Sequence, residues 1–401
     1  MFINLLKKIK RFILNICNVF IYKFKRFLIR IKSKKYRSLP LENKIVFSNF
    51  NGQGYGCNPK YIAEEILKRE YGWSLVWLVK DLNADIPCLI KKVKFNSKDS
   101  CKELSTAKII INNVKGDLNF IKKEGQVYIE TWHAGFSMKQ LEKEAGKTLP
   151  WDYILESKYN SKITDYLLSN SVEQTKEYRK NFWYDGSILE FGLPRNDPYF
   201  SKNTVEFVNN IKKELNIFEE QFVIMYAPTF RSHKDTFEVY GLDFDRLIKN
   251  LERKLGQNFK LLIRTHPNVT GVNNISADND KILNVSDYPD MQELLIISDL
   301  LITDYSSTMF EFSLLQKPTI LFAIDANKYD KKIRGLKEVF WQGLFPLAQS
   351  NDELEKIINN FDYGKSVDNV LDIRNKYCTF DNGDASQKVV NFLAQILQNG
   401  K

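Results

Sequence analysis

Short runs of apolar residues alternate with helical patterns along most of the chain beyond residue 40. The apolar runs predict buried strands over residues 44–48, 75–79, 108–112, 127–131, 222–226, 260–264, 281–284, 300–303 and 318–322. Between some of them, apolar residues recur every three or four positions and predict helices over residues 59–69, 244–255 and 291–297. This alternation is typical of an α/β fold with parallel sheets.

A turn-rich segment at residues 192–198 divides this pattern into two halves. At 401 residues the chain is too long for one ordinary compact domain and suits two. We therefore expect two doubly wound, Rossmann-like domains that face each other across a cleft, over residues 39–195 and 196–401. A separate helix is expected to precede them, over residues 1–38.

The pattern of that first segment is different. Lys and Arg fill much of the space between apolar residues spaced three or four apart, which are Ile3, Leu6, Ile9, Ile13, Ile16, Phe20, Phe24, Phe27 and Ile31. The longest uncharged run, residues 12–22, is too short for a hydrocarbon core, which needs about 20 residues. We predict a cationic amphipathic helix that lies on an anionic membrane surface. A basic helix that packs on the protein or touches RNA is the alternative.

Composition narrows the class of protein. Residues 1–37 hold twelve Lys and Arg and no acid, so the rest of a chain with formal net charge +10 is near −2 and gives no support for nucleic-acid binding. The five cysteines are scattered and without C-x-x-C spacing, which is typical of reduced thiols in a cytosolic protein. Because no H-E-x-x-H motif, paired Asp-x-Asp or Cys/His cluster occurs, we expect no protein-bound metal.

Polar side chains follow four of the predicted strands. They are His133, Thr229 with Arg231, His266, and the run from Asp304 to Thr308. In open parallel sheets, ligands bind at the edge formed by the carboxyl ends of the strands. A lone histidine in such a place is more often structural than catalytic, but two of the chain's three histidines occupy equivalent edges of the two halves. That coincidence favours a functional site in the cleft.

The run Ser306-Ser307-Thr308 opens a helical pattern directly after a predicted strand. Hydroxyls and unpaired N–H groups at a helix N-terminus favour anions such as phosphate. Glu311 comes three residues later and can hold a ribose diol, as an acidic residue does in nucleotide-binding folds. An ordinary capped helix with a polar first turn is the alternative.

A glycine-rich run and a set of three lysines each allow two interpretations. The run Gly52–Gly56 could hold phosphate or an acceptor, but it lacks the P-loop and G-x-G-x-x-G patterns and is better explained as a flexible turn at the cleft rim. Lys139, Lys143 and Lys147, each four residues apart, predict a cationic helical stripe. This stripe is either a solvated face or a surface for a phosphate-rich acceptor or a bilayer.

Five motifs, in their order along the chain, resemble those of the CDP-glycerol glycerophosphotransferase family. These are primases and polymerases of GT-B fold that build the polyol-phosphate chains of teichoic acids and capsules. The motifs are Glu130–Gly135, Gly192–Asp197, Tyr226–Arg231, Arg264–Pro267 and Thr303–Ser307. The likeness covers roughly residues 44–390. It implies that an acceptor hydroxyl attacks the distal phosphorus of a CDP-activated polyol and expels CMP, without a cofactor.

The resemblance also implies roles for single residues. His133 would be the general base, because a histidine titrates near the working pH. His266 and Arg264 would neutralise the pyrophosphate, and Arg231 would add positive charge. Phosphate binding would fall to Asp304, Ser306, Ser307 and Thr308, and ribose binding to Glu311. Two departures affect the details: the chain has Trp-His-Ala-Gly where the family usually has Trp-His-Gly, and Glu311 stands where many members have Asp.

The implied substrates are CDP-glycerol, or CDP-ribitol as the alternative donor, and a polyprenyl-linked or polymer acceptor. An enzyme held by residues 1–37 on the cytoplasmic face of the bacterial membrane would meet such an acceptor in two dimensions. Two other classes stay open: a nucleotide-sugar glycosyltransferase of the same GT-B fold, and a non-catalytic protein that binds the membrane surface. The sequence does not distinguish a primase from a polymerase, or teichoic acid from capsule.

Overall fold

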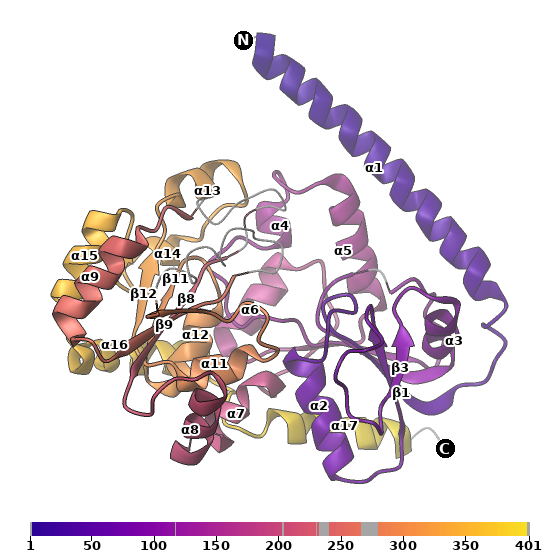
Figure 1. The fold of residues 1–401 in the computed structure, drawn as a ribbon. Coiled ribbons are helices and arrows are strands. Elements are labelled where there is room, and N and C mark those ends of the chain that lie inside the picture. The colour runs from indigo at the N-terminus through magenta and orange to yellow at the C-terminus, as the bar shows by residue number, and fades with distance from the viewer. Residues whose placement is uncertain are drawn as a thin grey trace.

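The structure is a computed structural model that describes residues 2–116, 118–202, 204–229, 231, 240–265 and 280–398. Two parallel sheets flanked by helices form the body of the molecule (Figure 1). The first has the strand order β3-β2-β1-β4-β5-β6-β7. Its strands are β1 (Glu42–Ser48), β2 (Ser74–Val79), β3 (Lys91–Lys94), β4 (Ala107–Asn112), β5 (Val127–Glu130), β6 (Tyr166–Leu168) and β7 (Ser187–Leu189). The helices between them are α2 (Cys57–Lys68), α3 (Lys98–Thr106), α4 (Glu142–Ala145), α5 (Trp151–Ile163) and α6 (Val172–Asn181).

The second sheet has the strand order β10-β9-β8-β11-β12-β13. Its strands are β8 (Phe222–Ala227), β9 (Phe259–Ile263), β10 (Ile282–Asn284), β11 (Leu300–Thr303), β12 (Thr319–Phe322) and β13 (Leu347–Ala348). The helices here are α7 (Pro198–Ser201), α8 (Val205–Glu214), α9 (Phe244–Leu255), α11 (Met291–Ile297), α12 (Thr308–Phe312), α13 (Ala326–Lys332), α14 (Glu338–Trp341), α15 (Asn351–Asn359), α16 (Tyr363–Tyr377) and α17 (Ala385–Gln398). Short 3-10 turns lie at Pro194–Asn196 and Ser313–Leu315. The predicted α/β fold with two parallel sheets is confirmed.

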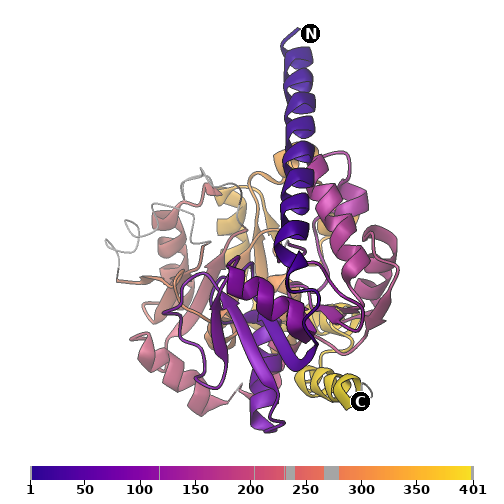
Figure 2. The same ribbon diagram turned by 90° about the vertical axis from the view of Figure 1, so that its right-hand side faces the viewer.

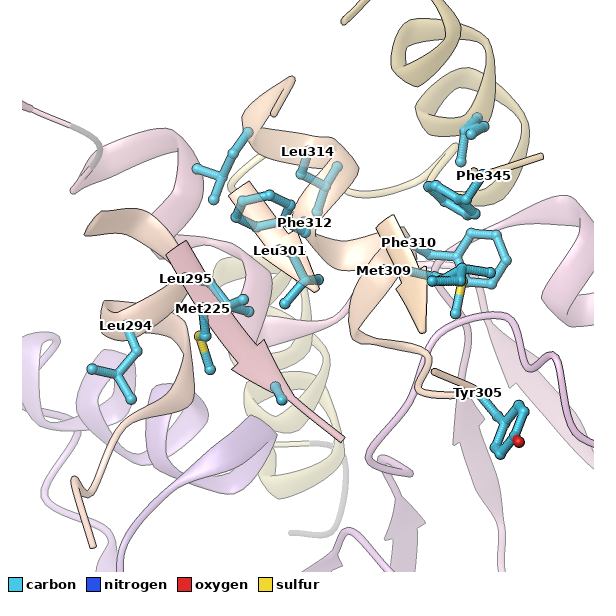
Figure 3. Packing of buried hydrophobic residues seen from close by; sticks show 14 of the residues in the cluster. Met225, Leu294, Leu295, Leu301, Tyr305, Met309, Phe310, Phe312, Leu314 and Phe345 are labelled. Carbon is cyan, nitrogen blue, oxygen red and sulfur yellow. The ribbon is translucent and has the colours of Figure 1, made fainter. Parts of the chain in front are cut away.

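Both sheets are buried by apolar side chains on their two faces, as expected for parallel strands. In the second half, Met225 of β8, Leu301 of β11 and Leu294 of α11 share a core with Phe310 and Phe312 of α12 (Figure 3). Full burial of each such side chain stabilises the fold by about 1.5–3 kcal/mol. This packing fixes the start of α12 at the carboxyl edge of the sheet, where ligands bind.

Every strand and helix predicted from the apolar pattern beyond residue 40 is present, with bounds shifted by at most two residues. The pattern did not show β3, β6, β7 and β13, which have two to four residues each. In β3, with sequence Lys-Lys-Val-Lys, only Val93 is buried. A strand at a sheet edge therefore forms here without an apolar run.

The last helix, α17, returns to the first half of the chain. Its residues Val389, Val390 and Leu393 share a core with β1 and β2. Asp197 caps its first turn by accepting hydrogen bonds from the N–H groups of Ala385 (3.0 Å) and Ser386 (2.7 Å). The predicted boundaries, 39–195 and 196–401, assign α17 to the second domain, whereas it packs on the first sheet. A division of the sequence into consecutive segments cannot show that the chain crosses back.

Helix α1 (Phe2–Lys34) is a single long helix whose N-terminal turns project beyond the body (Figures 1 and 2). The face that packs on the body is largely polar and includes Asn15, Arg26 and Ser33, with Ile29. Its apolar face points away from the protein, so that Phe20 is 71% exposed and Phe24 and Phe27 are each more than half exposed. The predicted amphipathic helix is thus present, with its apolar face outward.

Along the described residues, no helix combines the length and apolarity that a membrane crossing requires.

Candidate active site between the two halves

Two adjoining cavities lie between the halves of the chain. The larger, of about 450 Å³, is lined from the first half by Asn49, Phe50 and Gln53 and from the second by Arg264, Thr265, Ser286, Asp290 and others. The smaller, of about 240 Å³, is lined by His133, Lys139, Ser307, Glu311 and Arg334 among others. Arg195, Ser306 and Thr308 line both cavities, so the two cavities adjoin at these residues. Of the run Gly52–Gly56, Gln53 lines the larger cavity.

His133 is aimed by the turn that follows β5. Trp132 adopts a φ of 54°, a strained conformation for a bulky residue. Glu130 holds it by accepting a hydrogen bond from the Trp132 N–H (2.9 Å), and Asn58 donates to the Trp132 carbonyl (2.9 Å). Burial raises the pKa of Glu130 to about 8. The backbone is therefore fixed on both sides of the turn from which the imidazole projects.

The His133 ring has one nitrogen engaged and one left for chemistry. Nδ1 lies 2.8 Å from the backbone carbonyl oxygen of Asn113. A carbonyl only accepts, so Nδ1 carries the proton and Nε2 keeps its lone pair. Burial, with the nearby charges of Arg195 and Lys139, lowers the pKa of His133 to about 4. At neutral pH the ring is thus uncharged, with Nε2 free to accept a proton, as a general base must be before it acts.

Ser306, Ser307 and Thr308 lie at the junction of the two cavities, as the strand–turn–helix pattern predicts. The Ser306 and Thr308 hydroxyl oxygens are 2.8 Å apart, and the Thr308 N–H donates to Ser306 Oγ at 3.3 Å. The helix that they begin, α12, has only five residues. Its dipole is therefore small, and the hydroxyl and N–H groups themselves are what the site offers to an anion.

Arg231 and Asp304 have a different environment from the one predicted. Arg231 Nη2 lies 2.8 Å from Asp304 Oδ2, and its Nε donates to Asp325 at 3.0 Å. Asp304 also accepts from the N–H groups of Thr229 (2.9 Å) and Tyr305 (2.5 Å). Two carboxylates neutralise the arginine, which is outside the set of residues that line the cavities. Direct phosphate binding by these two residues is therefore not favoured; they order the loop that carries Thr229.

Arg264 is partly buried but, unlike Arg231, it lines the larger cavity. It donates to the backbone carbonyls of Val285 (3.1 Å) and Tyr288 (2.6 Å). In the part of the chain that is described, no carboxylate forms an ion pair with it. Its predicted neighbour His266 lies outside the described residues. The predicted role of His266 therefore stays a prediction.

Glu311 lines the smaller cavity but is not a free carboxylate. It forms a buried ion pair with Arg195 and also accepts a hydrogen bond from the Gly135 backbone. Burial raises the pKa of Glu311, although Arg195 opposes this shift. A ribose that binds Glu311, as predicted, would have to share its carboxylate with Arg195. The ion pair also links the two halves of the chain at this point.

Two cations of the site, Arg195 and Arg334, were not among the predicted site residues, and a third, Lys139, was predicted only as part of a helical stripe. Arg195 belongs to the motif at residues 192–197, yet nothing in that motif indicates that its side chain enters both cavities. Lys139 precedes α4 and lines the smaller cavity, so the predicted helical stripe with Lys143 and Lys147 does not form. Arg334 lies about 200 residues from His133 in sequence, and no motif around it indicated a site residue. Among the described residues, no group of three His, Cys, Asp or Glu side chains could hold a metal ion.

Comparison with known proteins agrees with this geometry. A family model described as CDP-glycerol:poly(glycerophosphate) glycerophosphotransferase matches residues 32–395. A teichoic acid poly(glycerol phosphate) polymerase of Staphylococcus epidermidis is 34% identical over an alignment of 391 residues that covers 91% of this chain and 53% of the relative. A polymerase of the same description from Bacillus spizizenii is 30% identical, covering 92% of this chain and 98% of the relative. A teichoic acid glycerol-phosphate transferase of Staphylococcus aureus is 32% identical, covering 89% and 94%. The chain thus spans about half the length of the first relative and nearly all of the other two.

Solved structures extend the comparison to the fold. The wall teichoic acid polymerase TagF superimposes with a TM-score of 0.82 at 29% identity, covering 98% of this chain and 99% of that one. A TagF variant soaked with CDPG gives the same TM-score at 30% identity. S. aureus MnaA with UDP, at 11% identity and a TM-score of 0.52, shares the fold alone. Taken with the cleft and its motifs, these matches show that the chain belongs to the CDP-glycerol:poly(glycerophosphate) glycerophosphotransferase family and has its GT-B-like fold.

Proposed function

We propose that this protein transfers glycerol phosphate from CDP-glycerol to a hydroxyl group of a teichoic acid acceptor and releases CMP. The proposal rests chiefly on one observation: His133 shares a cavity between the two halves with the Ser306–Thr308 cluster. The relatives named for glycerol-phosphate transfer support the choice of polyol, and the CDPG-soaked TagF variant supports the donor. Ribitol phosphate as the polyol and a capsule polymer as the acceptor stay predictions.

The reaction is an in-line displacement at phosphorus. The acceptor oxygen bonds to the distal phosphorus, the bond from that phosphorus to the bridging oxygen breaks, and CMP leaves with the electron pair. The acceptor proton passes to Nε2 of His133. Charge that develops on the transferred group needs fixed donors in a closed site. Arg195, Ser306 and Thr308 line both cavities, which supports a position for the two phosphates at their junction.

The larger cavity would then hold the nucleoside. Arg264 stands at that end with its charge not neutralised by an ion pair to a described residue, and the side chains of Thr265 and Ser286 offer hydroxyls. This arrangement supports a leaving group on the Arg264 side and an attacking hydroxyl on the His133 side. The two cavities therefore correspond to the two sides of an in-line transfer.

A panel of activated donors tests this function. The full chain is incubated with CDP-glycerol, CDP-ribitol and UDP-sugars, each with a teichoic acid acceptor, and the nucleotide product is identified. We expect CMP from CDP-glycerol and its loss in a His133→Ala variant. Consumption of a UDP-sugar alone, with release of UDP, would instead establish a GT-B glycosyltransferase.

We also propose that α1 holds the protein on the anionic cytoplasmic face of the membrane. Its outward apolar face includes Phe20, Phe24 and Phe27, which are 71%, 55% and 56% exposed. Cations flank this face, among them Lys23, Lys32 and Arg30. An apolar stripe between cations is the arrangement of helices that lie in the plane of a membrane interface.

A further inference from the structure

Two cations lie beside His133, away from the cavity proposed for the nucleoside. Lys139 and Arg334 line the smaller cavity with His133, and neither is among the residues that line the larger cavity at Arg264. They come from opposite halves of the chain. Two positive charges at one cavity wall favour the binding of an anion.

A short backbone pairing between the halves brings these two residues together. Lys139 and Leu336 form an antiparallel bridge, the Gln140 N–H donates to the Gly335 carbonyl (3.0 Å), and Arg334 Nε donates to the Gln140 carbonyl (3.0 Å). Gly335 has a φ of 89°, and a Cβ there would lie 2.4 Å from Gln140 Oε1. The glycine is thus required for a pairing that fixes both cations at the cavity wall.

The charges of this pair are only partly offset within the described chain, where Asp304 acts to raise the pKa of Lys139. Glu311, the acid in the same cavity, is paired with Arg195. No described carboxylate forms an ion pair with Lys139 or Arg334. Burial, together with the charge of Arg334, lowers the pKa of Lys139 to about 8. Thr229 Oγ1, which lines the same cavity, is buried without a hydrogen-bond partner. A bound anion would offset the repulsion between the cations and accept from these donors.

The direction of an in-line transfer indicates which anion this is. The leaving CMP lies toward Arg264, so the attacking hydroxyl must enter from the opposite side of the phosphorus, where Lys139, Arg334 and His133 lie. We propose that Lys139 and Arg334 bind a phosphate group of the acceptor, an inference that rests on the proposed function. The acceptor is then a chain whose attacking hydroxyl lies a few bonds from a phosphodiester. A neutral sugar hydroxyl, as in a priming reaction, leaves the pair unfilled.

Acceptor kinetics test this inference. KM is measured on the full chain for CDP-glycerol, for an acceptor that ends in glycerol phosphate, and for one that ends in a neutral sugar. In Lys139→Gln and Arg334→Gln we expect KM for the phosphate-ended acceptor to rise about tenfold, which corresponds to about 1.4 kcal/mol. KM for CDP-glycerol should stay within about twofold, and Lys139→Arg should recover most of the loss. Lys143→Gln, an exposed lysine nearby, is the matched control.

Equal losses with both acceptors, or a higher KM for CDP-glycerol, would overturn the inference, because the pair would then serve the transferred phosphoryl group. A second measurement needs no donor: glycerol 3-phosphate is titrated into wild type and into Lys139→Gln, with a melting curve to show that each is folded. Binding by wild type that the variant loses supports the acceptor site whatever the donor. If wild type uses CDP-glycerol and both proteins bind glycerol 3-phosphate equally, the inference fails and the proposed function stands.

Discussion

At the scale of single residues, the chemistry depends on how His133 is held rather than on its presence alone. A strained Trp132, a buried Glu130 and the carbonyl of Asn113 together decide which ring nitrogen faces the cavity. Strain of this kind persists only where neighbouring contacts impose it, and it often marks a functional site. The turn after β5 is therefore part of the proposed catalytic apparatus.

Replacement of His133 by Ala should lower kcat about 10²-fold or more, the usual contribution of a general base. Because the pKa of the ring is lowered to about 4, the wild-type rate should persist well below pH 6.5 and fall only as the ring gains a proton. The pH dependence of kcat/KM checks this. An acidic limb centred at or above pH 6.5, or an active His133→Ala variant, would contradict the assigned role.

Glu130 should act through the position of Trp132. Glu130→Gln keeps an oxygen acceptor for the Trp132 N–H and should retain most activity, whereas Glu130→Ala should lose both kcat and stability. Since burial raises the folded pKa of Glu130 to about 8, the folded state binds the extra proton. Its contribution to stability is present below about pH 4.3 and is lost as pH rises toward 8. Denaturant unfolding at several pH values should show that the free energy of unfolding falls more steeply with rising pH in wild type than in Glu130→Gln. Equal slopes for the two proteins would refute this role of Glu130.

The sequence predicted which residues gather at the cleft better than it predicted what they touch. His133 and Ser306–Thr308 were placed correctly because the carboxyl ends of parallel strands share one edge. Arg231 was assigned to phosphate, yet it pairs with Asp325, a residue 94 positions away. Partners this distant, and the pairing of Lys139 with Leu336, depend on the tertiary fold and leave no local pattern.

At the scale of elements, α1 is the clearest case in which pattern and structure agree. The spacing of apolar residues predicted the helix, and the structure adds that its polar face meets the body while its apolar face stays exposed. The short strands that were not predicted show where the sequence pattern fails. Strands of two to four residues such as β3 are held by their neighbours in the sheet, so local propensity does not reveal them.

Membrane binding by α1 should depend on both its exposed apolar face and its basic residues. Replacing Phe20, Phe24 and Phe27 with Ser should weaken sedimentation with anionic vesicles at least 10²-fold, since each buried Phe contributes about 1.5–3 kcal/mol. Replacing the basic residues of 1–37 should release the protein in the same assay while sparing turnover of a soluble acceptor. Val205→Ser, at an exposed apolar residue of α8, is the control and should bind normally. Unchanged sedimentation of the charge variant would rule out this role.

At the scale of the whole molecule, buried polar contacts join the halves around the cavities. Asp290 of the second half accepts from Lys60 (2.5 Å) and Tyr61 (2.7 Å) of α2. Arg195 pairs with Glu311 at the junction of the two cavities. The same contacts that connect the halves therefore shape the space in which substrates would meet.

Breaking one of these contacts should affect stability and activity differently. Arg195→Ala leaves Glu311 buried without its cation and should destabilise the fold by about 3–5 kcal/mol. Adding Glu311→Ala should restore much of that stability, because no buried charge is left unpaired. Activity should stay low in both variants, since Arg195 lines both cavities. Denaturant unfolding with parallel assays checks this, and a double variant as unstable as the single one would argue against the ion pair.

The most direct test of the central claim is the product of a single reaction. Phosphorus NMR of the full chain with CDP-glycerol and a teichoic acid acceptor should show one new phosphodiester for each CMP released, and His133→Ala should form both products more slowly by about 10²-fold or more. CMP without a phosphodiester, or a phosphodiester formed equally well by His133→Ala, would contradict transfer of glycerol phosphate with His133 as the base.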